Sequence, residues 1–235
     1  MRYILWDFDN TLAHRPGLWS QCLADLVNVL YPSQLAVKEH FSPYLSSGFP
    51  WHSPELSHHH LVSSDVWWNS LLPLFQQALK KGADINVKDS QLLAQRVRFE
   101  YTNPERWEVF SDTHNALETL SNAGWDHIIL SNHVPELEAL VEALGLAKHF
   151  KAIHTSALLG YEKPHANAFS SAVEDIRFNA ERIVMVGDSF AADYVGAISA
   201  GLEALLVRNT HPDCPNAFPD LAKLTNFLTN PSNIS

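Results

Sequence analysis

The sequence Tyr3-Ile4-Leu5-Trp6-Asp7-Phe8-Asp9-Asn10-Thr11 carries a short apolar run directly into two aspartates one residue apart. The apolar run predicts a buried strand of a parallel sheet, and ligands of open α/β sheets bind outside the carboxyl ends of the strands. Residues two apart on an extended chain point the same way. Asp7 and Asp9 are therefore predicted to face a substrate together.

Two carboxylates at this spacing suit phosphoryl transfer. One carboxylate can attack the phosphoryl group while the other moves protons. A carboxylate nucleophile divides the reaction into two easier steps through an aspartyl-phosphate. Such a concentration of negative charge also requires a cation, so the stretch predicts a catalytic site with a positive charge beside it.

Further polar groups follow apolar runs downstream. Ser131 and Asn132 follow residues 127–130, Lys163 follows 152–155, and Gly187-Asp188-Ser189, with Asp193 five residues past Asp188, follows 183–186. Acids and hydroxyls after strands are also common in turns and helix caps, so each group taken alone has an ordinary structural explanation. Their order, each after an apolar run, favours one shared catalytic site.

The pattern resembles the haloacid dehalogenase (HAD) superfamily, in its phosphatase branch. The four family motifs match Asp7–Thr11 (DxDxT), Ser131, Lys163 and Gly187–Asp193 (GDSxxxD). The resemblance implies a hydrolase that releases phosphate from phosphomonoesters, and it spans both sides of a long insertion.

The resemblance implies a role for each group that handles the phosphate. Asp7 would be the nucleophile. Asp9 would protonate the leaving oxygen and then activate water, general acid-base work that contributes roughly 10²–10⁴ in rate. Ser131 and Lys163 would hold the phosphoryl oxygens. Thr11 and the backbone amide of Asn132 are further expected phosphate donors.

The resemblance also implies a magnesium site. Mg²⁺ prefers oxygen ligands, and the expected ligands are Asp7, the backbone carbonyl of Asp9, Asp188 and a substrate oxygen. Asp193 would support Lys163 or the metal-bound waters from behind. Mg²⁺ is therefore the predicted cofactor.

The chain is predicted to have an α/β fold, a Rossmann-like doubly wound parallel sheet with an inserted helical domain. The resemblance implies a core of residues 1–13 and 108–210, and apolar runs there alternate with helical segments that stop at glycine, as in a parallel sheet. Residues 14–107 break this alternation and are mostly helical, which in the family corresponds to a C1-type cap that closes over the site. Residues 211–235, rich in Pro, Asn and Ser, are predicted to be a peripheral C-terminal tail.

Substrate selection is expected to depend on the cap. Trp51 and His52 lie in a segment between cap helices and could contact the substrate, although a buried aromatic ring and a surface histidine are the ordinary alternatives. Residues 61–81 predict a cap helix, and Pro73 should kink or split it because proline lacks the backbone N–H.

The composition of the chain disfavours several classes of binding partner. The net charge is −10 and no block of Lys or Arg occurs, which argues against general nucleic-acid or anionic-membrane binding. Cys22 and Cys214 are too few and too far apart to suggest a disulfide framework or a zinc site, and no stretch approaches the roughly 18 apolar residues of a membrane span. A cytoplasmic enzyme acting on a small soluble phosphorylated metabolite is predicted, with an oligomeric state that the sequence does not determine.

The presence of Asp9 distinguishes phosphatase activity from two other activities of the family. Haloacid dehalogenases and phosphonate-cleaving relatives lack the second aspartate of the first motif, so both activities are disfavoured. A phosphomutase uses the same pair of aspartates and remains an alternative, as does another HAD-type hydrolase. A non-catalytic binding protein on the same fold is disfavoured because Asp7, Asp9 and Lys163 are all present.

Overall fold

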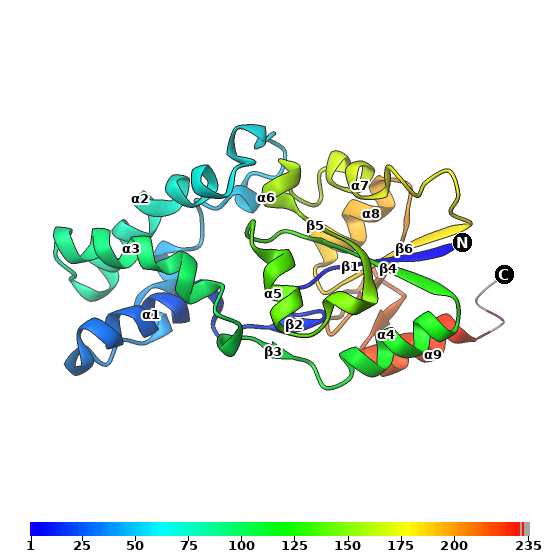
Figure 1. The fold of residues 1–235 in the computed structure, drawn as a ribbon, viewed down its shortest axis with the longest axis horizontal. Helices are drawn as coiled ribbons and strands as arrows, with labels where there is room; N and C mark the ends of the chain where they lie inside the picture. The colour runs from blue at the N-terminus through cyan, green and yellow to red at the C-terminus, as the bar shows by residue number, and fades with distance from the viewer. Residues whose placement is uncertain (231, 233–235) are drawn as a thin grey trace.

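The computed structural model describes residues 1–230 and 232, and its central layer is a parallel sheet (Figure 1). The strands are β1 (Arg2–Trp6), β4 (Trp125–Ser131), β5 (Phe150–Thr155), β6 (Arg182–Gly187), β7 (Glu203–Val207) and β8 (Ala217–Phe218). Their order is β5-β4-β1-β6-β7-β8, with β1 hydrogen-bonded to β4 on one side and β6 on the other. The predicted doubly wound α/β core is confirmed.

Helices cover both faces of the sheet, which explains why its strands are apolar without alternation. Ile4 and Trp6 of β1 belong to the cluster packed by α4 (Thr113–Asn122), α5 (Leu137–Ala143) and α9 (Leu221–Thr229). Tyr3 and Leu5 belong to the cluster packed by α7 (Ala166–Val173) and α8 (Gly196–Ser199) on the opposite face. Within the described chain, no helix combines the length and the hydropathy needed to cross a membrane.

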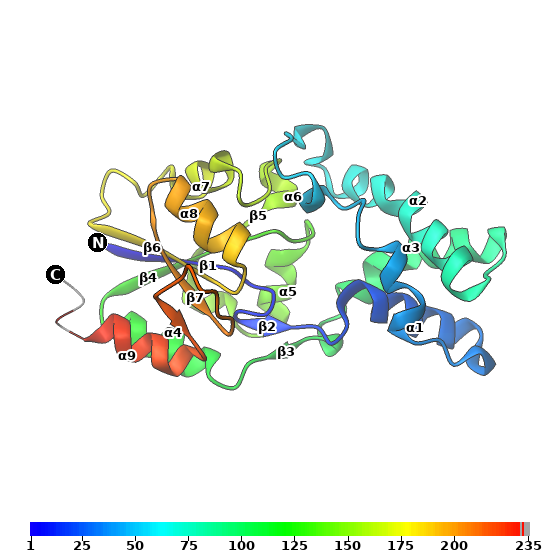
Figure 2. The same ribbon diagram turned by 180° about the vertical axis from the view of Figure 1, so that it is seen from behind.

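A helical lobe lies at the carboxyl end of β1 (Figure 2). The chain enters and leaves it through an antiparallel pair, β2 (Ala13–His14) and β3 (Glu108–Val109). Between them lie α1 (Leu18–Leu30), α2 (Ser64–Ala83) and α3 (Val87–Tyr101). Short 3-10 turns, one of which is Pro50–His52, connect α1 to α2. The lobe thus begins a few residues after the two aspartates, which places its first helix next to them.

Pro73 does not split α2, which runs as one helix from Ser64 to Ala83. Pro73 is exposed, and so is Asn69, whose carbonyl would be the partner of the missing N–H. Leu71 and Phe75 on the other face of the helix are buried, and their packing holds the helix together on both sides of Pro73. The sequence predicted a kink or a split at Pro73, and the split is wrong because the prediction weighed the lost hydrogen bond without this packing.

One carboxylate of the core binds both α2 and α3 of the lobe. Glu136, which precedes α5, accepts hydrogen bonds from the Ser64 hydroxyl (2.5 Å) and the Trp68 indole N–H (2.9 Å). The Arg98 guanidinium pairs with the same carboxylate at 2.7 Å. Residues of α2 and α3 are therefore fixed against the edge of the sheet where β4 ends.

The predicted C-terminal tail contains ordered structure. β8 extends the sheet beside β7, and α9 packs on α4 with Leu221, Leu224 and Leu228 fully buried. Their spacing is that of a helix face, but the Pro- and Asn-rich stretch before them dominated the sequence interpretation. Residues 231 and 233–235 of the predicted tail lie outside the described residues.

Leu224→Ala should lower the free energy of unfolding by about 2–5 kcal/mol, the usual effect of truncating a buried leucine. Urea denaturation of the full chain measures it. Lys223→Ala, on the exposed face of the same helix, should change the value by less than about 0.5 kcal/mol. Equal, small effects of both substitutions would mean that α9 is not part of the cooperative unit.

Candidate active site

The predicted site residues converge on one cavity of about 580 Å³ at the carboxyl ends of β1, β4 and β6. Eight of them line it: Asp7, Asp9, Trp51, Ser131, Asn132, Lys163, Asp188 and Asp193. The order of the strands explains the location. β4 and β5 lie on one side of β1 and β6 to β8 on the other, so the chain changes direction across the sheet at this edge, where a crevice opens.

The Lys163 ammonium lies at the base of the cavity and is almost completely buried. Its Nζ donates to Asp7 Oδ1 (2.8 Å), to Asp193 Oδ1 (2.6 Å) and to the Leu130 carbonyl (2.8 Å). Burial alone would lower the pKa of Lys163, but Asp193 and Asp7 outweigh it and raise the pKa above its ordinary value. Lys163 is therefore a fixed positive charge with all three donors occupied.

Asp7 has one engaged and one available oxygen. Its Oδ1 accepts from Lys163 and also from the Ser131 hydroxyl (2.8 Å), while its backbone N–H donates to Val186 of β6 (2.9 Å). No described residue donates a hydrogen bond to Oδ2. The carboxylate is thus held in one orientation, with an oxygen left for a reaction.

The Asn132 side chain fixes the segment that carries Lys163. Its Nδ2 donates to the Lys163 carbonyl (2.8 Å), and its Oδ1 accepts from the Lys163 backbone N–H (2.7 Å). The sequence indicated only the backbone amide of Asn132 as a phosphate donor. The structure adds this positioning contact, which no local pattern in the sequence reveals because the two residues are far apart along the chain.

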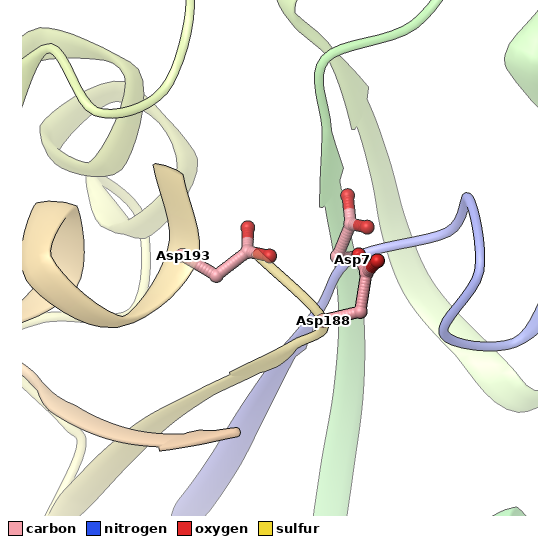
Figure 3. A group of neighbouring side chains, drawn as sticks. All are labelled: Asp7, Asp188 and Asp193. Carbon is pink, nitrogen blue, oxygen red and sulfur yellow. The ribbon is translucent and has the colours of Figure 1, made fainter. Parts of the chain in front are cut away.

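The carboxylates of Asp7, Asp188 and Asp193 form a tight group (Figure 3), with one oxygen of each within 4.8 Å of the others. Asp193 has both oxygens engaged, one with Lys163 and the other with the Ser189 backbone N–H (2.9 Å). Burial, and next the Asp7 carboxylate, raise the pKa of Asp188. Asp7 and Asp188 are therefore the side chains best able to accept a cation.

Asp9 lies on the same cavity. Burial, followed by the charges of Asp7 and Asp188, raises the pKa of Asp9 well above its ordinary value. The cavity holds four aspartates against the single ammonium of Lys163, so negative charge is in excess. Oxygen donors with uncompensated charge are the chemistry that Mg²⁺ selects. The Asp9 backbone carbonyl as a metal ligand stays a prediction.

His133 is a neighbour of Asp9 that the sequence analysis missed. Its Nε2 lies 3.5 Å from Asp9 Oδ1, and the ring is enclosed by Phe8, Tyr101 and Trp107. Burial lowers the pKa of His133 to about 4, so the ring is neutral near pH 7. Its position directly after Ser131 and Asn132 at a strand end is the signal that could have identified it.

Thr11 and His52 do not line the cavity. Thr11 is fully buried, and its carbonyl accepts from the Arg208 guanidinium (3.1 Å), so the loop after Asp9 turns its side chain into the protein. His52 is exposed and its Nδ1 accepts from the Phe49 backbone N–H (3.3 Å) within the turn. Trp51 alone of the predicted pair borders the cavity.

Glu162, directly before Lys163, is a buried acid outside the cavity. Burial raises the pKa of Glu162 to about 7, because the Ser156 hydroxyl and the Lys163 ammonium offset only part of the desolvation. Its ionisation therefore disfavours the folded state. The contribution of Glu162 to stability is retained below its ordinary pKa of 4.5 and is lost as the pH rises toward 7 and above.

Glu162→Gln should therefore become more stable relative to the wild type as the pH rises. The difference in the free energy of unfolding should grow by about 2–3 kcal/mol between pH 5 and pH 8, from a pKa difference worth about 1.4 kcal/mol per unit. Urea denaturation at both pH values measures this. Glu118→Gln, at an exposed position, is the matched control, and a similar pH trend in both variants would refute the assignment.

Proteins similar to this chain include hydrolases and phosphatases, in agreement with the chemistry of this site. The chain matches the haloacid dehalogenase-like hydrolase family model over residues 1–201. It is 29% identical over 228 residues to haloacid dehalogenase-like hydrolase domain-containing protein 3 of Danio rerio, covering 92% of this chain and 90% of that protein. It is 35% identical over 119 residues to the phosphoserine phosphatase of Thermus thermophilus, covering 49% of this chain and 47% of that protein.

A solved structure shares the fold across both lobes. The HAD-hydrolase YfnB from Bacillus subtilis, solved bound to magnesium, has a TM-score of 0.73 at 20% identity and covers 97% of this chain and 99% of its own. The four motifs gathered around one cavity, the family match and these similarities lead to one conclusion. The chain belongs to the haloacid dehalogenase-like hydrolase family, an enzyme with phosphatases among its relatives.

Proposed function

We propose that the chain is a Mg²⁺-dependent phosphomonoester hydrolase that acts on a small soluble phosphorylated molecule through an aspartyl-phosphate. The observation that carries the proposal is the state of Asp7. Its Oδ1 is held by Ser131 and Lys163, while its Oδ2 is left free beside Asp9 in the cavity. A nucleophile needs this combination of fixed orientation and one unengaged oxygen.

The two aspartates divide the chemistry. Asp7 attacks the phosphorus atom, the bond to the ester oxygen breaks, and a protonated Asp9 gives its proton to that oxygen. The raised pKa of Asp9, which favours its protonated form, supports this acid role. Asp9 then takes a proton from the water that attacks the phosphorus of the aspartyl-phosphate, and inorganic phosphate leaves with Asp7 restored.

Lys163 and Ser131 stabilise the charge that spreads over the transferring group. Charge stabilisation and positioning make up most of catalysis in phosphoryl transfer. Both side chains already touch Asp7, so they lie beside the phosphorus once the bond forms. Asn132 supports this indirectly by holding the backbone of Lys163.

Asp7, Asp188 and the Asp9 carbonyl would hold Mg²⁺, with Asp193 occupied by Lys163 and Ser189. The excess of carboxylates in the cavity supports this choice. When bound, the ion offsets negative charge on the phosphoryl oxygens. The same excess argues that the protein alone does not balance a dianionic substrate.

Residues 14–107 would act as a C1-type cap over a core of residues 1–13 and 108–210. Trp51 from this segment borders the cavity, and Glu136 ties α2 and α3 to the core. A closing lid excludes water while the intermediate exists. The cytoplasm remains the predicted compartment, on the composition of the sequence.

A phosphomutase remains the second candidate, because it requires the same pair of aspartates. The two activities differ in whether water or a second hydroxyl accepts the phosphoryl group from Asp7. Release of inorganic phosphate at the rate of ester consumption distinguishes a hydrolase from a mutase.

Asp7→Asn should abolish phosphate release, because an amide is not a nucleophile at this position. Phosphate release from acetyl phosphate and a panel of phosphomonoesters, with Mg²⁺ and with excess chelator, measures it. The wild type should be active only with Mg²⁺, and the exposed Asp213→Asn should match the wild type. Wild-type turnover by Asp7→Asn would remove Asp7 from the nucleophile role, and unchanged activity in chelator would remove the metal.

A further inference from the structure

The helical lobe contributes only apolar side chains to the wall of the cavity. These are Leu18 and Trp19 at the start of α1, and Trp51 and Pro54 in and after the turn Pro50–His52. The core supplies the polar residues around Asp7. The cavity therefore has a charged floor, where the phosphoryl group would react, and an apolar wall, where the rest of the substrate would lie.

The aromatic part of this wall is fixed in place. The Trp51 ring stacks on Phe49, with centroids 4.8 Å apart and planes 8° apart. The Trp19 ring stacks on Tyr101 at 3.6 Å and 5°, and the centroids of Trp19 and Trp51 are 6.0 Å apart. Stacked rings lose little freedom when a ligand packs against them, so the wall is preorganised for a flat apolar group.

The cavity offers no cation for a second anionic group. Among the residues that line it in the described chain, Lys163 is the single basic side chain. Its three donors are engaged by Asp7, Asp193 and Leu130. A carboxylate or second phosphate on the substrate would lose its hydration and gain no partner, at a site already rich in aspartates.

Two further cations, Arg15 and Lys38, line a separate cavity of about 500 Å³, which shares Asn10, Leu18 and Trp19 with the first. Arg15 there is buried and paired with Glu100 (3.2 Å) and Asp25 (3.6 Å), so its charge is already balanced. His14 and Lys38 are the other basic residues of this second cavity, and the His14 ring lies 3.6 Å from the Glu108 carboxylate. A second anion of a substrate that extends into this cavity would have to reach Lys38, so substitution of Lys38 tests for such an anion.

We infer that the leaving group of the substrate is uncharged and carries a planar ring that packs on Trp51 and Trp19. This inference rests on the proposed function and deepens it. It selects ring-bearing phosphomonoesters with no other anion, and it disfavours bisphosphates and phosphorylated carboxylic acids such as phosphoglycolate. A volume of about 580 Å³ is within the usual range for sites that enclose small ligands.

Two pairs of esters test this inference on the wild-type enzyme. The leaving groups of the first pair have similar reactivity, and in the second pair the difference in reactivity opposes the expected result. In the first pair, 2-phenylethyl phosphate should have a kcat/KM about tenfold or more above ethyl phosphate. In the second, 4-carboxyphenyl phosphate should fall about tenfold or more below phenyl phosphate, although its leaving group is the better one. Both effects are of the size that one pocket contact gives.

Variants then locate the contact. Trp51→Ala should reduce kcat/KM for 2-phenylethyl phosphate about tenfold more than for ethyl phosphate, and Trp51→Phe should restore most of the loss. Lys38→Ala should leave all four esters unchanged. The comparison of esters on the wild-type enzyme needs no variant, so it tests the preference for an uncharged ring even if Trp51→Ala does not fold.

The outcomes separate the two proposals. Phosphate release from all four esters without preference for the ring, or with preference for the carboxylate, overturns this inference and leaves the phosphatase function intact. A loss of 4-carboxyphenyl phosphate hydrolysis in Lys38→Ala also overturns it, because the second anion would then have a partner. If neither the four esters nor acetyl phosphate release phosphate, the proposed function is overturned and this inference with it.

Discussion

The buried ammonium of Lys163, held between Asp7 and Asp193, is the interaction on which the site depends. A buried charge is tolerated only when it is paired and fully hydrogen-bonded, and the removal of one partner leaves the others uncompensated. Lys163 meets this condition with two carboxylates and the Leu130 carbonyl. Its positive charge reduces the repulsion between the aspartates that share the cavity, and its hydrogen bond fixes the orientation of the Asp7 carboxylate.

The fold brings these groups together through strand order. Asp7 follows the central strand β1, and the strands on its two sides contribute Ser131 from β4 and Asp188 after β6. Each polar residue can leave the buried sheet only where its strand ends, so all of them meet at one edge. The helical lobe is inserted a few residues after Asp9. Its first helix therefore begins beside the site, and the reacting groups and the wall that would choose the substrate come from adjacent stretches of chain.

The sequence was sufficient to predict the sheet and the motif residues, because apolar runs followed by acids, a hydroxyl and a lysine are local patterns. It was insufficient wherever tertiary packing decided the outcome. Thr11 matches the motif yet turns into the protein, and Pro73 lies in an unbroken helix because packing on the opposite face holds it. His133 was missed because its contact with Asp9 crosses from one strand end to another. The apolar wall around Trp51 likewise arises from stacking between segments, which no periodicity records.

The most direct test of the central claim is to identify the residue that carries the phosphoryl group during turnover. The enzyme would be mixed with excess phosphomonoester and Mg²⁺, quenched rapidly, reduced with borohydride and digested for mass spectrometry. Reduction converts an aspartyl-phosphate to homoserine, so homoserine should appear at position 7 and be absent without substrate. Phosphate release with an unmodified Asp7, or with the modification on another residue, would contradict a nucleophilic role for the carboxylate that Lys163 and Ser131 hold in place.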